Sequence, residues 1–242
     1  MTGLPELSQM RAMVLAAGLG TRLRPLTETT PKPLVKVAGK ALLDYCLDLL
    51  RVADIRNAVV NTHYLGSQIE THVKAVTDLA ITISDESACL LETGGGVKKA
   101  LSLLGDAPFF VLNSDVIVRD RGMNSLARMH DRWNPDEMDA LLLLHPTVSA
   151  ISYEGRGDFT MNRGGIAERR DERSVAPYLF TGVQLLNPAL FEGTPEGPFS
   201  LNLLYDKAAA NGRLVGLRHD GQWLHVGTAA ALATADRIIG GS

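Results

Sequence analysis

Residues 13–35, MVLAAGLGTRLRPLTETTPKPLV, decide how the rest of this sequence is interpreted. The five apolar residues 13–17 predict a buried strand. The strand breaks into Gly18-Leu19-Gly20-Thr21-Arg22, and a tail follows that ends in Pro31-Lys32-Pro33. Because glycine lets the backbone turn tightly, the N–H groups of such a turn can face phosphate oxygens or a base edge. This stretch therefore predicts a binding site for an anionic ligand.

The turn lacks the features of two common phosphate-binding loops. No third glycine of a dinucleotide fingerprint follows Gly20, and no Gly-Lys-Ser/Thr follows it either, so a P-loop is also excluded. The positive charge comes instead from Arg22, Arg24 and Lys32, which can pair with phosphates. The prolines on either side of Lys32 stiffen the backbone there, which a solvated lysine would not require. We therefore favour a binding role over a tight turn with solvated arginines.

The composition favours a globular protein that binds a small molecule rather than nucleic acid. The chain has 242 residues, of which 45% are hydrophobic and 21% charged, and its net charge is −3. This length is sufficient to bury a substantial core. A weakly acidic protein lacks the basic surface that releases counterions from nucleic acid, so we expect no nucleic-acid partner. A few local cations suffice for an anionic small molecule.

The cysteines and the absence of a targeting pattern predict a cytoplasmic protein. Cys46 and Cys89 lie in apolar segments and are expected to be core thiols rather than a disulfide. The first ten residues lack a basic region followed by an apolar one, as a signal peptide would have. No apolar run approaches the ~18 residues of a membrane span, so we expect no membrane association.

Strand-like and helix-like segments alternate over the first two-thirds of the chain. Strands are expected at residues 11–17, 57–61, 79–84, 108–112 and 140–144. Helices are expected at residues 41–52, 66–73, 95–104 and 124–133. Strands separated by helices form right-handed βαβ units. The pattern predicts an α/β protein with a Rossmann-like mixed, mainly parallel sheet and helices on both faces.

The regular alternation of strand-like and helix-like segments ends after Pro146. Short strands around Phe159, Ile166 and residues 178–186 are joined by glycine, asparagine and arginine turns, which favours antiparallel hairpins. Two helices follow, at residues 201–210 and 229–239. Since no long linker or internal repeat divides the chain, we expect one domain over residues 1–242, with residues 147–242 adding a small antiparallel lobe and the C-terminal helices.

Ligands of open parallel sheets bind beyond the carboxyl ends of the strands, and three features fall at such ends. They are the turn after Ala17, the run Glu92-Thr93-Gly94-Gly95-Gly96, and Asn113-Ser114-Asp115. Glycines that open a helix are expected to leave exposed N–H groups and room for a flat ring or a ribose. Asp115 is suited to Mg²⁺, which binds one or two carboxylates together with substrate oxygens and water. The convergence of the three features predicts a single site.

Together these motifs resemble those of the sugar-1-phosphate nucleotidyltransferases. Their order and spacing match nearly the whole chain, and later segments agree: Gly157-Asp158-Phe159, Thr181-Gly182 and Trp223-x-x-Val226-Gly227-Thr228. The resemblance implies the nucleotide-diphospho-sugar transferase fold, with a nucleotide-binding part in residues 1–146 and a sugar-binding lobe in residues 147–242. It also implies that a nucleoside triphosphate and a sugar 1-phosphate are the partners. Many relatives associate through regions that this short chain lacks, so we expect a monomer or loose dimer.

The resemblance also implies roles for individual residues. Arg22 is expected on the departing pyrophosphate, Lys32 between the α-phosphate and the sugar phosphate, and Asp115 on the Mg²⁺ ion; these are the expected catalytic residues. The nucleotide-binding residues that it implies are Leu15, Ala16, Ala17, Gly18, Gly20, Thr21, Arg22, Glu92, Thr93, Gly94 and Asn113. The sugar-binding residues are Asp158, Glu168, Thr181 and Gly182. Two alternatives stay open for Arg169 and Arg170, namely contact with the sugar phosphate or a solvated charge cluster.

One position departs from the family pattern. Relatives usually carry an aspartate in Trp-x-Asp-x-Gly-Thr, where it completes the Mg²⁺ site, but this sequence has His225. A neutral imidazole suits Mn²⁺, Co²⁺ or Zn²⁺ better than the hard Mg²⁺ ion. His225 could bind a softer ion such as Mn²⁺ directly, hold a metal-bound water, donate to a phosphate, or be purely structural. We favour the water or phosphate role, because Asp115 and the triphosphate can hold Mg²⁺ largely by themselves.

A second set of sequence features predicts which substrates the protein uses. Residues 92–96 and 155–159, and the lack of a C-terminal left-handed β-helix, resemble family members that use UTP and N-acetylmuramate 1-phosphate in cell-wall recycling. GTP with mannose 1-phosphate or heptose 1-phosphate is the alternative within the same mechanism. A catalytically silent nucleotide-sugar sensor is the alternative of another class. Arg22, Lys32 and Asp115 are all present, which favours an enzyme over a sensor.

Overall fold

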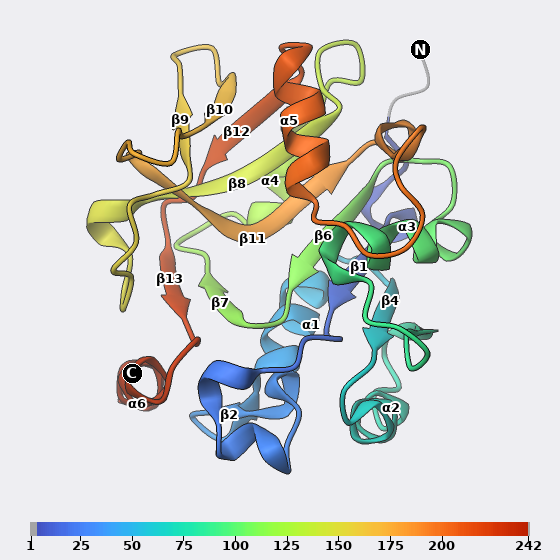
Figure 1. Cartoon of the computed structure of the whole chain (residues 1–242), viewed down its shortest axis with the longest axis vertical. Coiled ribbons are helices and arrows are strands. Elements are labelled where there is room, and N and C mark those ends of the chain that lie inside the picture. The colour runs from blue at the N-terminus through green and yellow to red at the C-terminus, as the bar shows by residue number, and fades with distance from the viewer. Residues whose placement is uncertain (1–3, 242) are drawn as a thin grey trace.

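The computed structural model describes residues 4–241 and has a nine-stranded central sheet with helices on both faces (Figure 1). One half of the sheet is parallel, in the order β6-β1-β4-β5. Its strands are β1 (Arg11–Leu15), β4 (Asn57–Thr62), β5 (Ala80–Asp85) and β6 (Phe109–Asn113). The crossovers between them contain α1 (Leu42–Val52), α2 (Gly66–Lys74) and α3 (Glu92–Leu104). The predicted mixed α/β sheet is therefore confirmed.

The other half of the sheet comes from residues beyond 139. It contains β8 (Ala140–Pro146), β9 (Phe159–Met161), β10 (Ala167–Arg169), β11 (Tyr178–Leu186) and β12 (Leu214–Arg218). Strand β11 pairs antiparallel with both β6 and β8, while β12 runs parallel to β8. The sheet thus continues past residue 146 without a boundary, and the short pair β9–β10 extends its edge. The lobe expected over residues 147–242 shares the central sheet with the first part.

The remaining elements form two small sheets and three helices. The sheets pair β2 (Lys36–Val37) with β3 (Lys40–Ala41), and β7 (Val116–Arg119) with β13 (Gln222–His225). The helices are α4 (Ser125–Arg132), α5 (Asn202–Ala210) and α6 (Ala229–Gly240), and α6 lies beside β2 and β13 (Figure 1). Strands β7, β12 and β13 were not predicted, because each is only four or five residues long and lacks a clear alternation.

Two hydrophobic clusters cover the two faces of the sheet. In β1, Ala12 and Val14 join the cluster that includes Leu47 of α1, whereas Met13 joins the cluster that includes Val97 of α3. A strand that is buried on both faces needs an uninterrupted apolar sequence, which explains the run at residues 13–17. Each buried aliphatic side chain stabilises the fold by about 1.5–3 kcal/mol.

The two cysteines differ in their surroundings. Cys46 is buried in α1 as expected, and its thiol donates to the Asn113 carbonyl oxygen at 3.4 Å. Burial raises the pKa of the Cys46 thiol to about 12, with smaller contributions from Asp115 and Asp44, so it stays protonated. The prediction for Cys89 was wrong. Cys89 is exposed, because it lies on the loop between β5 and α3 and not in a strand.

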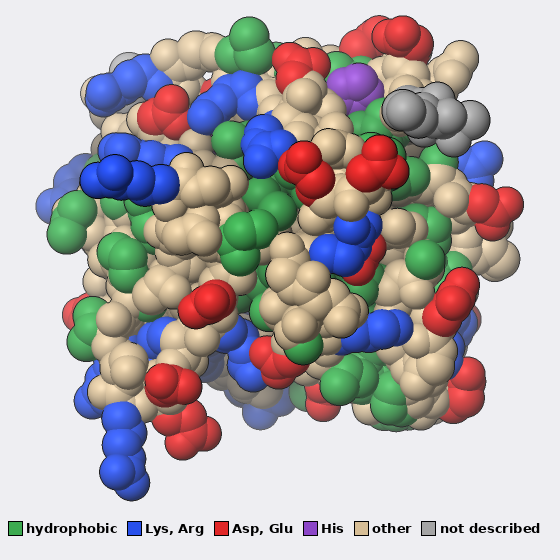
Figure 2. All heavy atoms as spheres, turned by 90° about the horizontal axis from the view of Figure 1, so that it is seen from above, with side chains coloured by type: hydrophobic (Ala, Val, Ile, Leu, Met, Phe, Trp, Pro, Cys, Tyr) green, Lys and Arg blue, Asp and Glu red, His purple; other side chains and the backbone are tan. Residues whose placement is uncertain are grey.

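Charged side chains of both signs are interspersed over the face shown in Figure 2. This arrangement accompanies the small net charge of −3. Among residues 4–241, no helix combines the length and the apolar character that crossing a membrane requires.

A buried pair of histidines connects the ends of β8 and β12. The Nδ1 atoms of His145 and His219 are 3.1 Å apart, and each residue is only 1% exposed. The Nε2 atom of His145 contacts the Ser149 hydroxyl at 3.1 Å, and that of His219 lies 3.4 Å from Asp120 Oδ1. Burial lowers the pKa of His145. The hydrogen bonds with Ser149 and His219 oppose this effect, whereas the charges of His219 and Arg218 reinforce it.

We expect mild acid to destabilise the protein through His145. Its pKa in the folded state lies below the value of about 6.5 in the unfolded chain, so above that pH both states are neutral and stability is unaffected. As the pH falls through about 6.5, the unfolded chain is protonated first, and the free energy of unfolding drops by at most about 1.4 kcal/mol per pH unit. His145→Gln should remove this part of the slope in urea unfolding.

His145 and its acidic neighbour Asp120 affect the stability of the protein in different pH ranges. Burial raises the pKa of Asp120, but the hydrogen bonds from His219 and Ser125 outweigh this effect and hold it below its ordinary value. Asp120 therefore contributes stability that is lost only at lower pH, below about 4. Equal slopes for wild type and His145→Gln between about pH 5.5 and 7 would contradict the role of His145.

Candidate active site

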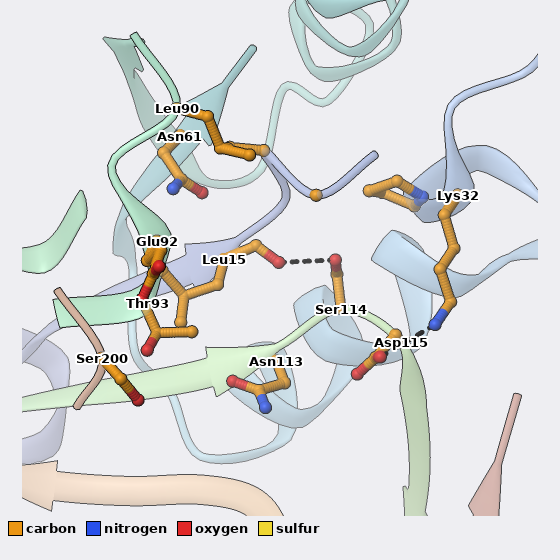
Figure 3. Close-up of a pocket in the computed structure, with 13 residues that line it drawn as sticks. Leu15, Lys32, Asn61, Leu90, Glu92, Thr93, Asn113, Ser114, Asp115 and Ser200 are labelled. Atoms are coloured by element: carbon orange, nitrogen blue, oxygen red, sulfur yellow. Dashed lines mark hydrogen bonds and ion pairs between the residues drawn. The ribbon is translucent and has the colours of Figure 1, made fainter. Parts of the chain in front are cut away.

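A cavity of about 390 Å³ opens at the carboxyl ends of β1 and β6, beside the start of α3 (Figure 3). A second hollow of about 360 Å³ adjoins it. The two share four residues: Gly18, Lys32, Leu90 and Asp115. The first extends to Asn113, Thr93 and Ser200, whereas the second follows the glycine turn to Arg22 and Gly227. The three sequence features at strand ends therefore converge on one site, as predicted.

The glycine turn after β1 is shaped by contacts between its own residues. Gly20 has a left-handed backbone (φ 63°), and the short 3-10 helix Thr21–Leu23 follows it. A Cβ atom at Gly20 would lie 3.0 Å from the Lys32 Cβ atom, so glycine lets the lysine segment approach the turn. The Thr27 hydroxyl donates to the Gly20 carbonyl oxygen at 2.8 Å and closes the turn. This conformation places Arg22 on the wall of the second hollow.

Lys32 and Asp115 form an ion pair at the border between the two hollows. The Lys32 Nζ atom lies 2.8 Å from Asp115 Oδ2, and the lysine side chain is only 11% exposed. Lys32 begins a 3-10 helix after Pro31, and Asp115 follows β6. The Ser114 hydroxyl donates to the Leu15 carbonyl oxygen at 2.6 Å, which ties the end of β6 to the end of β1 (Figure 3). Cation and carboxylate are therefore held by separate parts of the chain.

The start of α3 differs from the expectation that its glycines expose their N–H groups. Helix α3 begins at Glu92, and Gly94, Gly95 and Gly96 are all buried. The N–H groups of Gly94 and Gly95 donate to the Phe199 carbonyl oxygen at 2.8 and 3.1 Å. A Cβ atom at Gly94 would lie 2.4 Å from the Phe199 ring. Gly94 and Gly95 therefore admit the loop before α5, and only Glu92 and Thr93 of this run line the cavity.

His225 lies near the ion pair, at the end of β13. Strand β13 pairs with β7, which places His225 opposite Val116, the residue after Asp115. Its ring stacks on Trp223 with a centroid distance of 6.0 Å, and a Cβ atom at Gly227 would lie 2.2 Å from the ring. Burial lowers the pKa of His225; Asp115 opposes this effect, and Lys32 and Arg22 reinforce it. His225 is thus a neutral imidazole near neutral pH.

The donors available to a divalent cation are few. Within residues 4–241, no three His, Cys, Asp or Glu side chains are grouped as a metal site would require. Asp115 offers a carboxylate beside His225, and substrate phosphates would have to supply the other ligands. This donor set fits Mg²⁺, which commonly binds through one or two carboxylates plus phosphates and water.

The four residues expected at the sugar lie outside the 390 Å³ cavity. Thr181 is fully buried, and its hydroxyl donates to the Leu143 carbonyl oxygen at 2.8 Å. Gly182 (φ 85°) packs behind Asn113, since a Cβ atom there would lie 2.9 Å from the Asn113 Cβ atom. Asp158 lines a separate cleft of about 310 Å³ and accepts a hydrogen bond from the Phe180 N–H group at 2.8 Å. Glu168 is exposed on β10.

The two arginines left open by the sequence both have protein partners. Arg169 forms a bidentate pair with Asp206 of α5, with N–O distances of 2.9 and 2.7 Å. Arg170 donates to the Gly157 carbonyl oxygen at 2.6 Å and to carbonyl oxygens of the following loop. Both line the 310 Å³ cleft, and the Arg169–Asp206 pair is itself exposed to solvent.

The remaining residues with expected nucleotide roles divide between the two hollows. Leu15, Ala17, Gly18, Glu92, Thr93 and Asn113 line the first, and Gly18, Gly20, Thr21 and Arg22 line the second. Ala16 and Gly94 line neither, because their N–H groups bond to Asn61 and to Phe199. Sequence reasoning missed several lining residues: Pro33, Asn61, Leu90, Ser114 and Ser200. A polar residue near a strand end was the available signal for Asn61, whereas nothing local indicated Ser200.

The fold and the site define an α/β protein whose glycine turn and cationic side chains line a cavity at the carboxyl ends of its parallel strands. Residues 11–153, more than half of the chain, match the family model described as nucleotidyl transferase, so the chain belongs to that family and is a nucleotidyltransferase. The N-acetylmuramate alpha-1-phosphate uridylyltransferase of Caulobacter vibrioides is 43% identical over 93% of this chain and 95% of its own length. The protein of the same name from Neisseria meningitidis serogroup B is 36% identical over 96% of this chain and 99% of its own.

A solved structure from Bacillus anthracis has the same fold. Described as a glucose-1-phosphate thymidylyltransferase in complex with sucrose, it superposes with a TM-score of 0.80 and covers 96% of this chain and 95% of its own. At 18% identity the likeness concerns the fold alone. The predicted membership of the nucleotidyltransferase family is confirmed by the family model and the two curated relatives.

Two glycines of the site should respond differently to alanine. Gly94→Ala places a methyl group against Phe199, so we expect the free energy of unfolding to fall by about 1–3 kcal/mol despite the better helix propensity of alanine. Gly18→Ala meets no atom within 4 Å, so stability should be unchanged while nucleotide affinity falls. Chemical denaturation and calorimetric titration with UTP measure the two effects. A stable Gly94→Ala protein would contradict the packing role.

Proposed function

We propose that this protein is a uridylyltransferase that joins UTP and N-acetylmuramate 1-phosphate to give UDP-N-acetylmuramate and pyrophosphate, as a step of peptidoglycan recycling. The observation that carries the proposal is the Lys32–Asp115 pair, because a cation and a carboxylate of the kind that Mg²⁺ prefers lie where the two hollows meet. The identities of the sugar and the base are inferred from the two relatives named N-acetylmuramate alpha-1-phosphate uridylyltransferase, which match nearly the whole chain.

The reaction requires alignment and charge neutralisation more than proton transfer. A phosphate oxygen of the sugar 1-phosphate attacks the α-phosphorus of UTP, the bond from that phosphorus to the bridging oxygen breaks, and pyrophosphate leaves with the electron pair. The nucleophile is already an anion near neutral pH, so no general base is needed. The protein must hold two repelling phosphates in line and stabilise the developing negative charge.

The cations of the site match these requirements. Lys32 lines both hollows and can contact the α-phosphate and the sugar phosphate, while Arg22, on the wall of the second hollow, receives the departing pyrophosphate. Asp115 would hold Mg²⁺, or Mn²⁺ in its place, and the ion neutralises phosphate charge when bound. His225 would hold a metal-bound water or donate to a phosphate oxygen, since a neutral imidazole is a weak ligand for Mg²⁺.

The nucleotide and the sugar would occupy different sides of the sheet edge. We assign the base and ribose to the wall formed by Ala17, Gly18 and Glu92. Ala16 and Gly94 would act from behind this wall, where their N–H groups bond to Asn61 and to Phe199. We assign the sugar to the side of residues 147–242, with Asp158 and Glu168 nearest to it. Thr181 and Gly182 would act from behind the cavity, through their contacts with Leu143 and Asn113.

Lys32→Met should lower kcat by about 10²–10³-fold, since this is the typical cost of one lost electrostatic contact in a transition state. The circular dichroism spectrum should stay that of a folded protein. Lys36→Met removes an exposed lysine from the neighbouring strand β2 and is the matched control, with activity expected to be unchanged. Pyrophosphate release under saturating substrates measures both variants. A Lys32→Met enzyme as active as the control would contradict the assignment.

The substrates are tested with a panel of pairs. UTP and GTP are each combined with N-acetylmuramate, N-acetylglucosamine, mannose and heptose 1-phosphates in Mg²⁺, and pyrophosphate release is recorded. We expect turnover with UTP and N-acetylmuramate 1-phosphate. Turnover with GTP and mannose or heptose 1-phosphate would keep the mechanism and overturn the substrates. Binding of UTP without pyrophosphate release from any pair, in Mg²⁺ or Mn²⁺, would replace the enzyme with a nucleotide sensor.

A further inference from the structure

A buried chain of hydrogen bonds runs behind the nucleotide side of the cavity. The Asn61 Oδ1 atom accepts from the Ala16 N–H group at 2.6 Å, and Asn61 Nδ2 donates to Glu86 Oε1 at 2.7 Å. The second oxygen, Glu86 Oε2, accepts from the Leu91 N–H group at 3.2 Å. Two side chains thus connect the turn after β1 to the first turn of α3. The Ala16 N–H group can only donate, and this fixes the orientation of the Asn61 amide.

The Glu86 carboxylate is unusual because it is buried without a cation. Glu86 is 0% exposed, Asn61 is 2% exposed, and no ion pair to Glu86 occurs in residues 4–241. A buried carboxylate is costly unless hydrogen bonds and nearby dipoles compensate it. Here the compensation comes from Asn61 and from the N-terminal end of the 13-residue helix α3, where partial positive charge accumulates.

The third glycine of the run at residues 94–96 makes room for this carboxylate. A Cβ atom at Gly96 would lie 2.6 Å from Glu86 Oε1 and 3.1 Å from Asn61 Nδ2. The sequence of α3 is therefore adapted to the buried pair. An apolar side chain at position 86 would avoid the desolvation cost, so the fold alone does not explain a glutamate here.

The two segments that the pair connects each form a wall of the cavity. Ala17 and Gly18 line it from the first segment and Leu90 and Glu92 from the second, and Asn61 lines it as well. Glu92 has a left-handed backbone (φ 58°), which costs a non-glycine residue about 1–3 kcal/mol and persists only where neighbours hold it. The bond from the Leu91 N–H group to Glu86 fixes the residue immediately before it.

We propose that Glu86 and Asn61 are positioning residues that set the distance between the two walls, so that the nucleoside part of the triphosphate is bound in one fixed place. This inference rests on the proposed function for the identity of the nucleotide. Neither residue needs to contact the reacting phosphates. Their loss should therefore weaken nucleotide binding, whereas the affinity for the sugar 1-phosphate should change little.

The hydrogen-bond pattern suggests a test in which the amide of Asn61 and the carboxylate of Glu86 exchange places. Glu86→Gln keeps the shape of the side chain but replaces one of its two acceptor oxygens with an NH₂ group. The two donors, Asn61 Nδ2 and the Leu91 N–H group, then have one acceptor between them, so the NH₂ group must face one of these donors. Asn61→Asp places a second buried carboxylate against Glu86. In the double variant, the carboxylate introduced at position 61 accepts hydrogen bonds from the Ala16 N–H group and from the amide introduced at position 86. The oxygen of that amide accepts from the Leu91 N–H group. Each single substitution therefore removes one of the three hydrogen bonds, and the two substitutions together restore all three.

We expect each single variant to raise KM for UTP at least about 10-fold, because a buried donor or carboxylate is left without a partner. KM for the sugar 1-phosphate should stay within about 2-fold of the wild-type value. The double variant should recover most of the loss. Exposed Glu192→Gln is the control for removal of one negative charge and should match the wild type. Calorimetric titration with UTP alone gives the same comparison without turnover.

The outcomes separate this inference from the proposed function. If the wild type binds UTP but releases no pyrophosphate, the proposed reaction fails while the binding comparison still tests Glu86 and Asn61. Single variants that melt at lower temperature but bind UTP as the wild type does would overturn the positioning role and leave a structural one. A double variant no better than the worse single variant would also overturn it, because the coupling would be absent.

Discussion

The ion pair between Lys32 and Asp115 is the contact on which the organisation of the site depends. Its partners are 83 positions apart in the chain, and each is delivered by a rigid element: a proline-flanked 3-10 helix for the lysine, and the end of a buried strand for the aspartate. Because the Lys32 side chain is 11% exposed, solvent screens this pair less than it screens the surface pairs. The site is therefore charged but preorganised before any substrate arrives.

The glycines around the site serve packing more often than ligand contact. Gly20 admits Lys32, Gly94 and Gly95 admit the loop before α5, and Gly227 admits the His225 ring. Gly18, by contrast, has no neighbour within 4 Å and faces the cavity. A glycine-rich motif thus brings distant segments close enough to form walls. In the proposed reaction, the positive charge that acts on phosphate would come from Arg22 and Lys32 rather than from N–H groups of α3.

The sequence predicted the parts of the site that are local and missed the parts that arise from distant packing. The strand before Gly18 and the carboxylate of Asp115 follow from apolar runs and the residues at their ends, and Lys32 follows from the prolines on either side of it. The partner of the glycines in α3 lies about a hundred residues later, in the loop that carries Phe199, and no local pattern indicates it. Likewise, the burial of Thr181 depends on the pairing of β11 with β8.

The replacement of the usual aspartate by His225 is consistent with the electrostatics of the pocket. Burial is the main reason that a protonated imidazole is disfavoured here, and it lowers the pKa of His225; Asp115 opposes this effect, while Lys32 and Arg22 reinforce it. A second carboxylate at this position would compete with phosphate oxygens for the same cations. A neutral histidine leaves the cations to the triphosphate and adds one donor or one lone pair. In the proposed reaction, the charge of the substrates, and a cation bound with them, would complete the arrangement that Lys32 and Asp115 begin.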